Sequence, residues 1–174
     1  MLLIVISSVQ MNTPDRTRQR IDFITSQISI LTSKSWSVWD YERANSAYQI
    51  VDAGRASWPE ARIAIPVLIE TLESHSRFAQ KYPKQACTSD SKNGIRYQSA
   101  VALGKLKAKE AVPVLIDVLE NDPALHVKMV AATALGEIGQ SSKKALPVLR
   151  KASTSTSLLA YNARQAIGEI EVAE

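Results

Sequence analysis

The fold of this chain is decided by residues 122–149, which read DPALHVKMVAATALGEIGQSSKKALPVL. Apolar residues recur at intervals of three and four in the first half, which places them on one face of a helix. Gly139 then predicts a helix stop, because glycine accepts a backbone geometry that other residues resist. Pro147 suits the first turn of a second helix, where a missing amide costs nothing. We call these predicted helices A and B. The apolar face of helix A consists of Val127, Val130, Ala131, Ala134, Leu135 and Ile138.

Both motifs recur along the chain. The helix A motif has copies ALGKL at 102–106, ALGEI at 134–138 and AIGEI at 166–170, so its glycines lie 32 residues apart. The helix B motif has copies AIPVLIETL from Ala64, AVPVLIDVL from Ala111 and ALPVLRKAS from Ala145. Such a period indicates stacked repeats, in which a single helix pair cannot bury its own apolar face. We therefore predict an all-α fold, an α-solenoid of about three and a half antiparallel helix pairs.

One domain is expected over residues 1–174. An insertion interrupts it, because successive Pro-Val-Leu units lie 47 residues apart between Pro66 and Pro113 but 34 apart in the next copy. Pro83 and Gly94 break regular structure in this stretch. The expected segments are an N-terminal capping region at 1–40, a degenerate first repeat at 41–74, an inserted basic loop at 75–93, repeat 2 at 94–122, repeat 3 at 123–153 and a terminal half repeat at 154–174.

The repeat resembles the HEAT-like repeats, particularly the short form first named from phycobilisome lyases. That form reads approximately Asp-x-x-Val-Arg-x-x-Ala-x-x-Ala-Leu-Gly-x-Ile-Gly, followed by Ala-Ile-Pro-x-Leu. Residues 122–149 follow it closely with Lys128 at the arginine place, and Ile95-Arg96 begins the previous copy. The final copy departs, since Tyr161-Asn162 replaces Val-Arg. The resemblance implies the solenoid fold, but its members include scaffolds, bilin-lyase subunits and a few nucleic-acid enzymes.

No catalytic, metal or cofactor site is expected. Cys87 is the single cysteine, which excludes an intramolecular disulfide and a four-thiolate zinc site. His75 and His126 lie near no metal-binding or nucleophile motif. The apolar segment Leu2–Val9 is shorter than the about 20 residues that a membrane span needs, so we expect it to cover an apolar end of the stack. A cytoplasmic location is the simpler expectation, the alternative being export with residues 1–10 as part of a signal.

Charge is distributed in blocks along the chain. Residues 77–109 carry eight Lys or Arg against one Asp, whereas residues 110–127 carry four acids and no base. The polar positions that follow Pro-Val-Leu on helix B are expected to line the inner face of the superhelix. Their side chains are acidic in the first two copies and basic in the third. The candidate partner-binding residues are Glu70, Glu73, Asp117 and Glu120 in the strip, Arg150 and Lys151 at the reversal, and Lys81 and Lys84 in the inserted loop.

The leading prediction is a non-enzymatic protein-interaction module or scaffold, which binds a protein partner through the inner B-helix face and the inserted loop. An acidic strip repels a phosphate backbone, which argues against nucleic acid in that groove. Two alternatives stay open. The resemblance alone suggests an accessory subunit in attachment or removal of a bilin chromophore, and the basic 77–109 block suggests nucleic-acid binding. The oligomeric state, the partner and the choice between Met1 and Met11 as the start also stay open.

Overall fold

The computed structural model describes residues 13–33, 40–55, 58–83, 94–154 and 156–172. These parts of the chain form helices and no strand, which confirms the predicted all-α solenoid. The α-helices are α1 (Thr13–Thr32), α2 (Asp40–Arg55), α3 (Ile65–Lys81), α5 (Ile95–Lys105), α6 (Val112–Asn121), α7 (Leu125–Ile138), α8 (Leu146–Ala152) and α9 (Leu158–Val172). The short 3₁₀ helices are η1 (Pro59–Ala64), η2 (Lys109–Ala111) and η3 (Gly139–Ala145).

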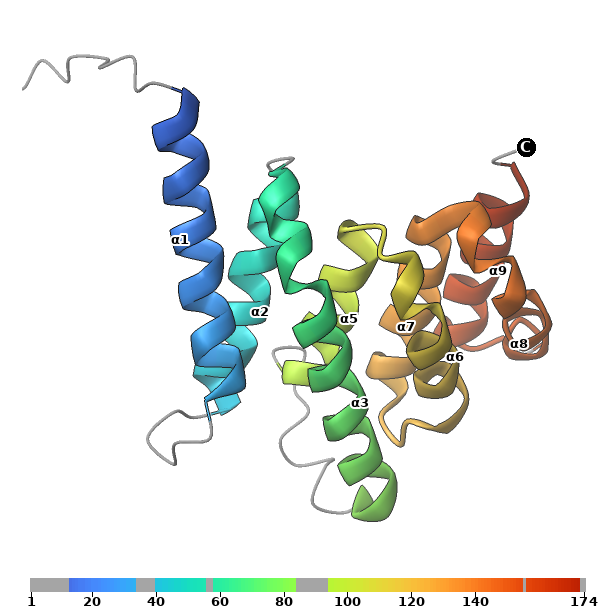
Figure 1. Cartoon of the computed structure of the whole chain (residues 1–174). Coiled ribbons are helices and arrows are strands. Elements are labelled where there is room, and N and C mark those ends of the chain that lie inside the picture. Colours follow the sequence, from blue (N-terminus) through green and yellow to red (C-terminus); the bar gives the residue numbers. More distant parts are fainter. Residues whose placement is uncertain (1–12, 34–39, 56–57, 84–93, 155, 173–174) are drawn as a thin grey trace, which may run out of the picture.

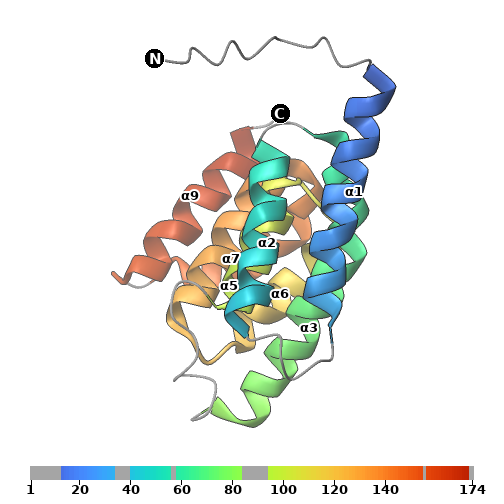
Figure 2. The same ribbon diagram turned by 90° about the vertical axis from the view of Figure 1, so that its left-hand side faces the viewer.

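The helices stack in two layers. The A layer consists of α2, α5, α7 and α9, and the B layer of α3, α6 and α8 (Figures 1 and 2). Helix α1 lies at one end of the stack, where it packs against α2 and η1. Neighbouring A helices approach each other closely, because their Ala-Leu-Gly motifs place small residues between them. The B helices face solvent on the side opposite to the A layer.

Each B helix packs against the A helix that follows it in the chain. Helix α6 packs closely against α7. The same holds for α8 against α9. The reason is the connection: residues 122–124 form a tight turn after α6, whereas η2 and the residues around it carry the chain from the A layer to the B layer.

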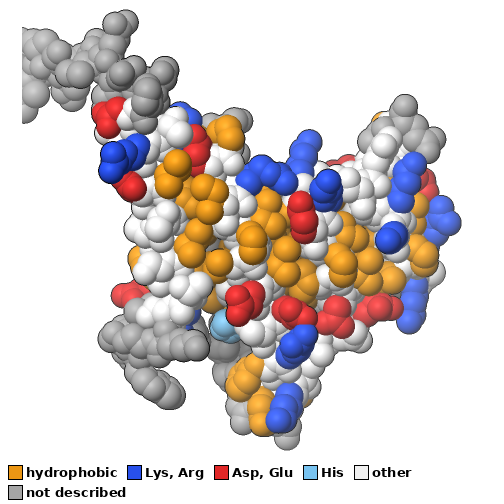
Figure 3. Space-filling view, viewed as in Figure 1, with side chains coloured by type: hydrophobic (Ala, Val, Ile, Leu, Met, Phe, Trp, Pro, Cys, Tyr) orange, Lys and Arg blue, Asp and Glu red, His pale blue; other side chains and the backbone are white. Residues whose placement is uncertain are grey.

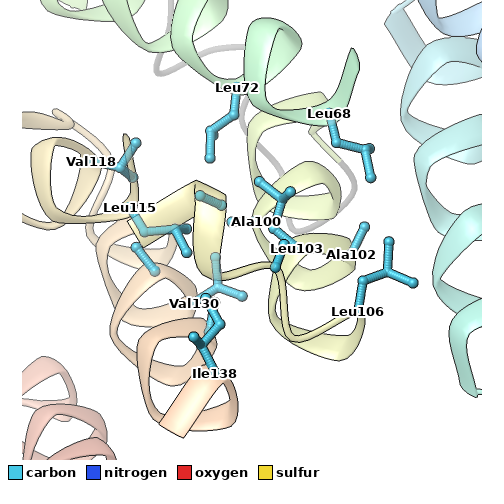
Figure 4. Packing of buried hydrophobic residues seen from close by; sticks show 14 of the residues in the cluster. Leu68, Leu72, Ala100, Ala102, Leu103, Leu106, Leu115, Val118, Val130 and Ile138 are labelled. Carbon is cyan, nitrogen blue, oxygen red and sulfur yellow. The ribbon is translucent and has the colours of Figure 1, made fainter. Parts of the chain in front are cut away.

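The core lies between the two layers. The leucine of each Pro-Val-Leu motif points into it, and Leu68, Leu115 and Leu149 are each 0% exposed. Figure 4 shows Leu68 and Leu115 reaching from the B layer toward Leu103 and its neighbours on α5. Each proline lies in the first turn of its B helix, as the sequence predicts. The valine of the motif lies on the flank of the helix, where it is partly exposed.

A buried ion pair joins the start of α5 to the turn between α6 and α7. Arg96 on α5 is 3% exposed and Asp122, in the turn before α7, is 1% exposed. Arg96 Nε lies 3.2 Å from Asp122 Oδ2, and Arg96 Nη2 donates a hydrogen bond of 3.2 Å to Oδ1. The backbone amide of Ala124 donates to the same Oδ1 at 2.9 Å. The pair therefore ties the turn that leads into α7 to the preceding A helix.

Gly139 ends α7 with φ 72° and ψ −141°, a combination that L residues rarely adopt. We expect Gly139→Ala to lower the free energy of unfolding by about 1–2 kcal/mol, because the Cβ strains this backbone although space surrounds it. Chemical denaturation followed by circular dichroism measures the change. Gln140→Ala, at the exposed next position, is the control, and an equal effect of both variants would contradict the strained geometry.

The predicted inserted loop at 75–93 is wrong in its first part. Helix α3 continues to Lys81, so residues 75–81 are helical and extend α3 beyond the length of α6 and α8. Apolar and small residues keep their helical spacing here, and Ser76 and Ala79 are buried on the same side as Leu72. Residues 84–93, and the predicted cover formed by Leu2–Val9, lie outside the described residues.

Candidate partner-binding face

A band of apolar side chains crosses the exposed face of the B layer (Figure 3). It arises because the Pro-Val-Leu motif recurs at the same height on each B helix. Its leucine is buried, and the residues on either side of that leucine reach the surface. The band consists of Ile63 in η1, Pro66 and Ile69 on α3, Pro113, Val114 and Ile116 on α6, and Pro147 and Val148 on α8, all at least partly exposed.

A groove runs between α3 and α6 within this face. Its walls are Ile69, Glu73, Arg77 and Gln80 from α3, and Pro113, Val114 and Asp117 from α6, with Glu110 at one end. The groove therefore combines apolar side chains with the carboxylates of Glu73, Glu110 and Asp117.

The four predicted acids form a row beside the apolar band (Figure 3). Glu70 and Glu73 lie on α3, and Asp117 and Glu120 lie one helix further along the stack, each at least partly exposed. Arg77 forms an ion pair with Glu73 one turn away. Asp117 accepts hydrogen bonds from the amides of Gln80, at 3.2 Å, and Asn121, at 2.8 Å.

Most of this row has no cationic partner. Among the described residues, Glu70, Asp117 and Glu120 have no lysine or arginine within salt-bridge distance. Because these carboxylates lack cationic partners, the row is a strip of negative charge on a chain whose net charge is +4. Such a strip favours a ligand of positive charge.

At the α8 end of the row, the predicted change from negative to positive charge depends on Lys151 rather than on Arg150. Arg150 Nη2 donates to Glu171 Oε1 of α9 at 3.0 Å, so its charge is directed away from the row and partly balanced. Lys151 is exposed in the last turn of α8, at the position that Asp117 occupies on α6, and it forms no ion pair with a described residue.

Of the two candidates from the predicted loop, Lys81 lies within the described residues, on α3. Lys81 is exposed at the end of α3, where its Nζ lies 5.3 Å from the ring centre of Tyr82. Phe78 is 54% exposed and its ring centre lies 5.0 Å from that of Tyr82. Lys84 lies outside the described residues. The aromatic pair was missed from sequence, because the segment was assigned to a loop without a helical face.

The basic 77–109 block does not gather into one patch within the described chain. Arg96 is buried, and Arg77 and Lys105 form ion pairs with Glu73 and Glu137. Lys107 lies at the turn between α5 and α6, whereas α3 ends at the opposite edge of the stack (Figure 1). Lys81, at the end of α3, is therefore separated from the exposed Lys107 and Lys109 at the turn between α5 and α6.

A second hollow lies on the A layer between α5, α7 and α9. Tyr97, His126, Met129 and Asn162 are among its lining residues, and the rings of Tyr97 and His126 lie 6.2 Å apart between centres. His75 is remote from it and hydrogen-bonds through Nδ1 to the backbone oxygen of Thr71 at 2.9 Å. Each histidine therefore packs locally, and the described residues contain no group of three or more possible metal ligands.

Comparison with known proteins supports the repeat. The family model of HEAT repeats matches residues 83–168, so this part of the chain is HEAT-like. This match does not distinguish the phycobilisome-lyase type from other HEAT repeats. No curated protein matches the chain. Among the described helices, none is long and apolar enough to cross a membrane.

Proposed function

We propose that this chain, with HEAT-like repeats over residues 83–168, is a non-enzymatic protein-interaction module that binds a partner through its B layer. The observation that carries the proposal is the apolar band on α3, α6 and α8. HEAT repeats are generally scaffolds for protein interaction, and apolar side chains aligned on consecutive repeats offer a partner one continuous surface. The predicted acidic residues border this surface on one side.

Binding of a protein partner through the B layer is favoured over the two alternative functions. Nucleic-acid binding through the basic block needs cations on a common surface, but Arg96 is buried and Lys105 is paired with Glu137. A role in bilin attachment or removal rests on resemblance alone, and no feature of the described residues favours it.

Site-specific photo-crosslinking in cells of the source organism tests the proposal. A benzophenone side chain at Pro113, in the apolar band, is expected to yield adducts with a defined protein, identified by mass spectrometry. The same group at Gln165, exposed on α9 of the A layer, is the matched control and is expected to yield none of these adducts. Absence of protein adducts at Pro113, or the same adducts from both positions, would refute binding through the B layer.

A further inference from the structure

We infer that the B-layer face takes an amphipathic helix with basic residues along one flank, an inference that rests on the proposed function. The apolar band contains the groove between α3 and α6, and the acidic row lies beside the band. One ligand surface must therefore present apolar and basic side chains together.

The spacing of the B helices sets the spacing of the apolar anchors. Ile69 and Val114 line the groove between α3 and α6. Ile116 on α6 and Val148 on α8 are their counterparts in the next copy of the repeat. Packed helices lie about 8–10 Å apart, so the two pairs of apolar residues are separated by about the same distance. A helix advances about 10 Å in seven residues, so apolar side chains at i and i+7 match both pairs.

The acidic row sets the charge of one flank. Glu73 follows Ile69 by one helical turn, and Glu120 follows Ile116 by one turn, so the row lies about 5 Å beside the band. Ion pairs with Glu70, Asp117 and Glu120 need Lys or Arg along the neighbouring flank of the ligand. Lys151 stands at the α8 end, so an acidic side chain or a helix C-terminus matches the face there.

A helix fits this arrangement better than an extended peptide does. Successive side chains of a strand point to opposite faces, so a strand whose apolar side chains contact the band turns the others to solvent. On a helix, an apolar stripe and a basic stripe lie side by side along the axis. The band spans three B helices, which corresponds to about 12–15 residues of bound helix.

Fluorescence anisotropy with the full chain tests this inference. The probe is a labelled synthetic helix of 15 residues with a leucine stripe and a lysine flank, and the control peptide carries glutamate in place of every lysine. We expect the lysine peptide to bind at least about tenfold more tightly, with the difference shrinking as salt is raised. Equal affinity of the two peptides would overturn the inference.

A pair of double variants shows where the probe binds. Glu70→Lys with Glu120→Lys reverses two exposed carboxylates of the row, neither of which has an ion-pair partner among the described residues. We expect this variant to lose at least about tenfold affinity for the lysine peptide and to gain affinity for the glutamate peptide. Glu42→Lys with Glu169→Lys makes the same charge change at exposed A-layer positions and is expected to leave both affinities within about twofold. Equal losses in the two variants would also overturn the inference.

Failure of this inference is distinguishable from failure of the proposed function. If the lysine peptide shows no preference but Pro113 still crosslinks to a protein, the B layer binds a partner of other chemistry. If Pro113 yields no adduct, the proposed function itself fails, whatever the peptides do.

Discussion

Asp122→Ala is expected to lower the free energy of unfolding by about 3–5 kcal/mol. The change leaves Arg96 buried at 3% exposure without the carboxylate that lies 3.2 Å away. It also removes the acceptor of the Ala124 amide at the start of α7. Removing one partner of a buried ion pair costs far more than the net contribution of the intact pair. Chemical denaturation followed by far-UV circular dichroism measures the loss.

Two further variants separate the ion pair from a general sensitivity of the fold. Asp22→Ala removes an exposed carboxylate on α1 and is expected to change stability by less than about 0.5 kcal/mol. Arg96→Met combined with Asp122→Ala removes both charges and is expected to be more stable than Asp122→Ala alone. If the double variant is less stable than the single one, the cost comes from lost packing or from the Ala124 amide and the charge argument is wrong.

Alanine at the three repeat glycines is expected to act with opposite signs. A Cβ on Gly104 would lie 2.8 Å from the Cα of Ala134 on the next A helix, and a Cβ on Gly136 would lie 2.8 Å from the Cα of Ala166. Both contacts involve backbone, which cannot move aside without separating two helices. We expect Gly104→Ala and Gly136→Ala to lower stability by about 1–3 kcal/mol, despite the better helix propensity of alanine.

Gly168 is the matched control that the chain itself provides. It occupies the same place in its motif, but a Cβ there meets nothing within 4 Å. Gly168→Ala is therefore expected to stabilise the chain by about 0.5–1 kcal/mol through helix propensity alone. The midpoints of denaturation of the three variants give the comparison. Destabilisation by all three to the same degree would show that close approach is not the reason for the glycines.

The local elements could be predicted because each depends on residues near it in sequence. The apolar spacing of Val127 to Ile138 predicted α7, and all six residues of its predicted apolar face are buried. Gly139 and Pro147 marked the end of one helix and the start of the next through backbone geometry alone. The glycines of the helix A motif recur every 32 residues, and together with the repeated Pro-Val-Leu motif they predicted the stack, because repeats with equal faces pack alike.

The acidic residues of the candidate site could be predicted from the sequence, but its apolar band was not. The acids at Glu70, Glu73, Asp117 and Glu120 were named because they follow the Pro-Val-Leu motif. The apolar band was missed, although the sequence holds a signal for it: Ile69 and Ile116 directly follow the leucine that fills the core. Adjacent residues on a helix are turned from each other by about 100°, so each isoleucine lies at the edge of the buried face and is partly exposed.

Sequence alone therefore determined the helices, their order and the repeat, since these follow from spacing and backbone preference. Only the tertiary structure decided which residues of equal type differ in role. Arg96 counted as a surface cation in the basic block, yet it is buried against Asp122. Gly168 reads as a copy of Gly136, yet a Cβ there would lie within 4 Å of no neighbour in the described chain. Burial and pairing depend on neighbours that are distant along the chain, and these neighbours are set by how the repeats stack.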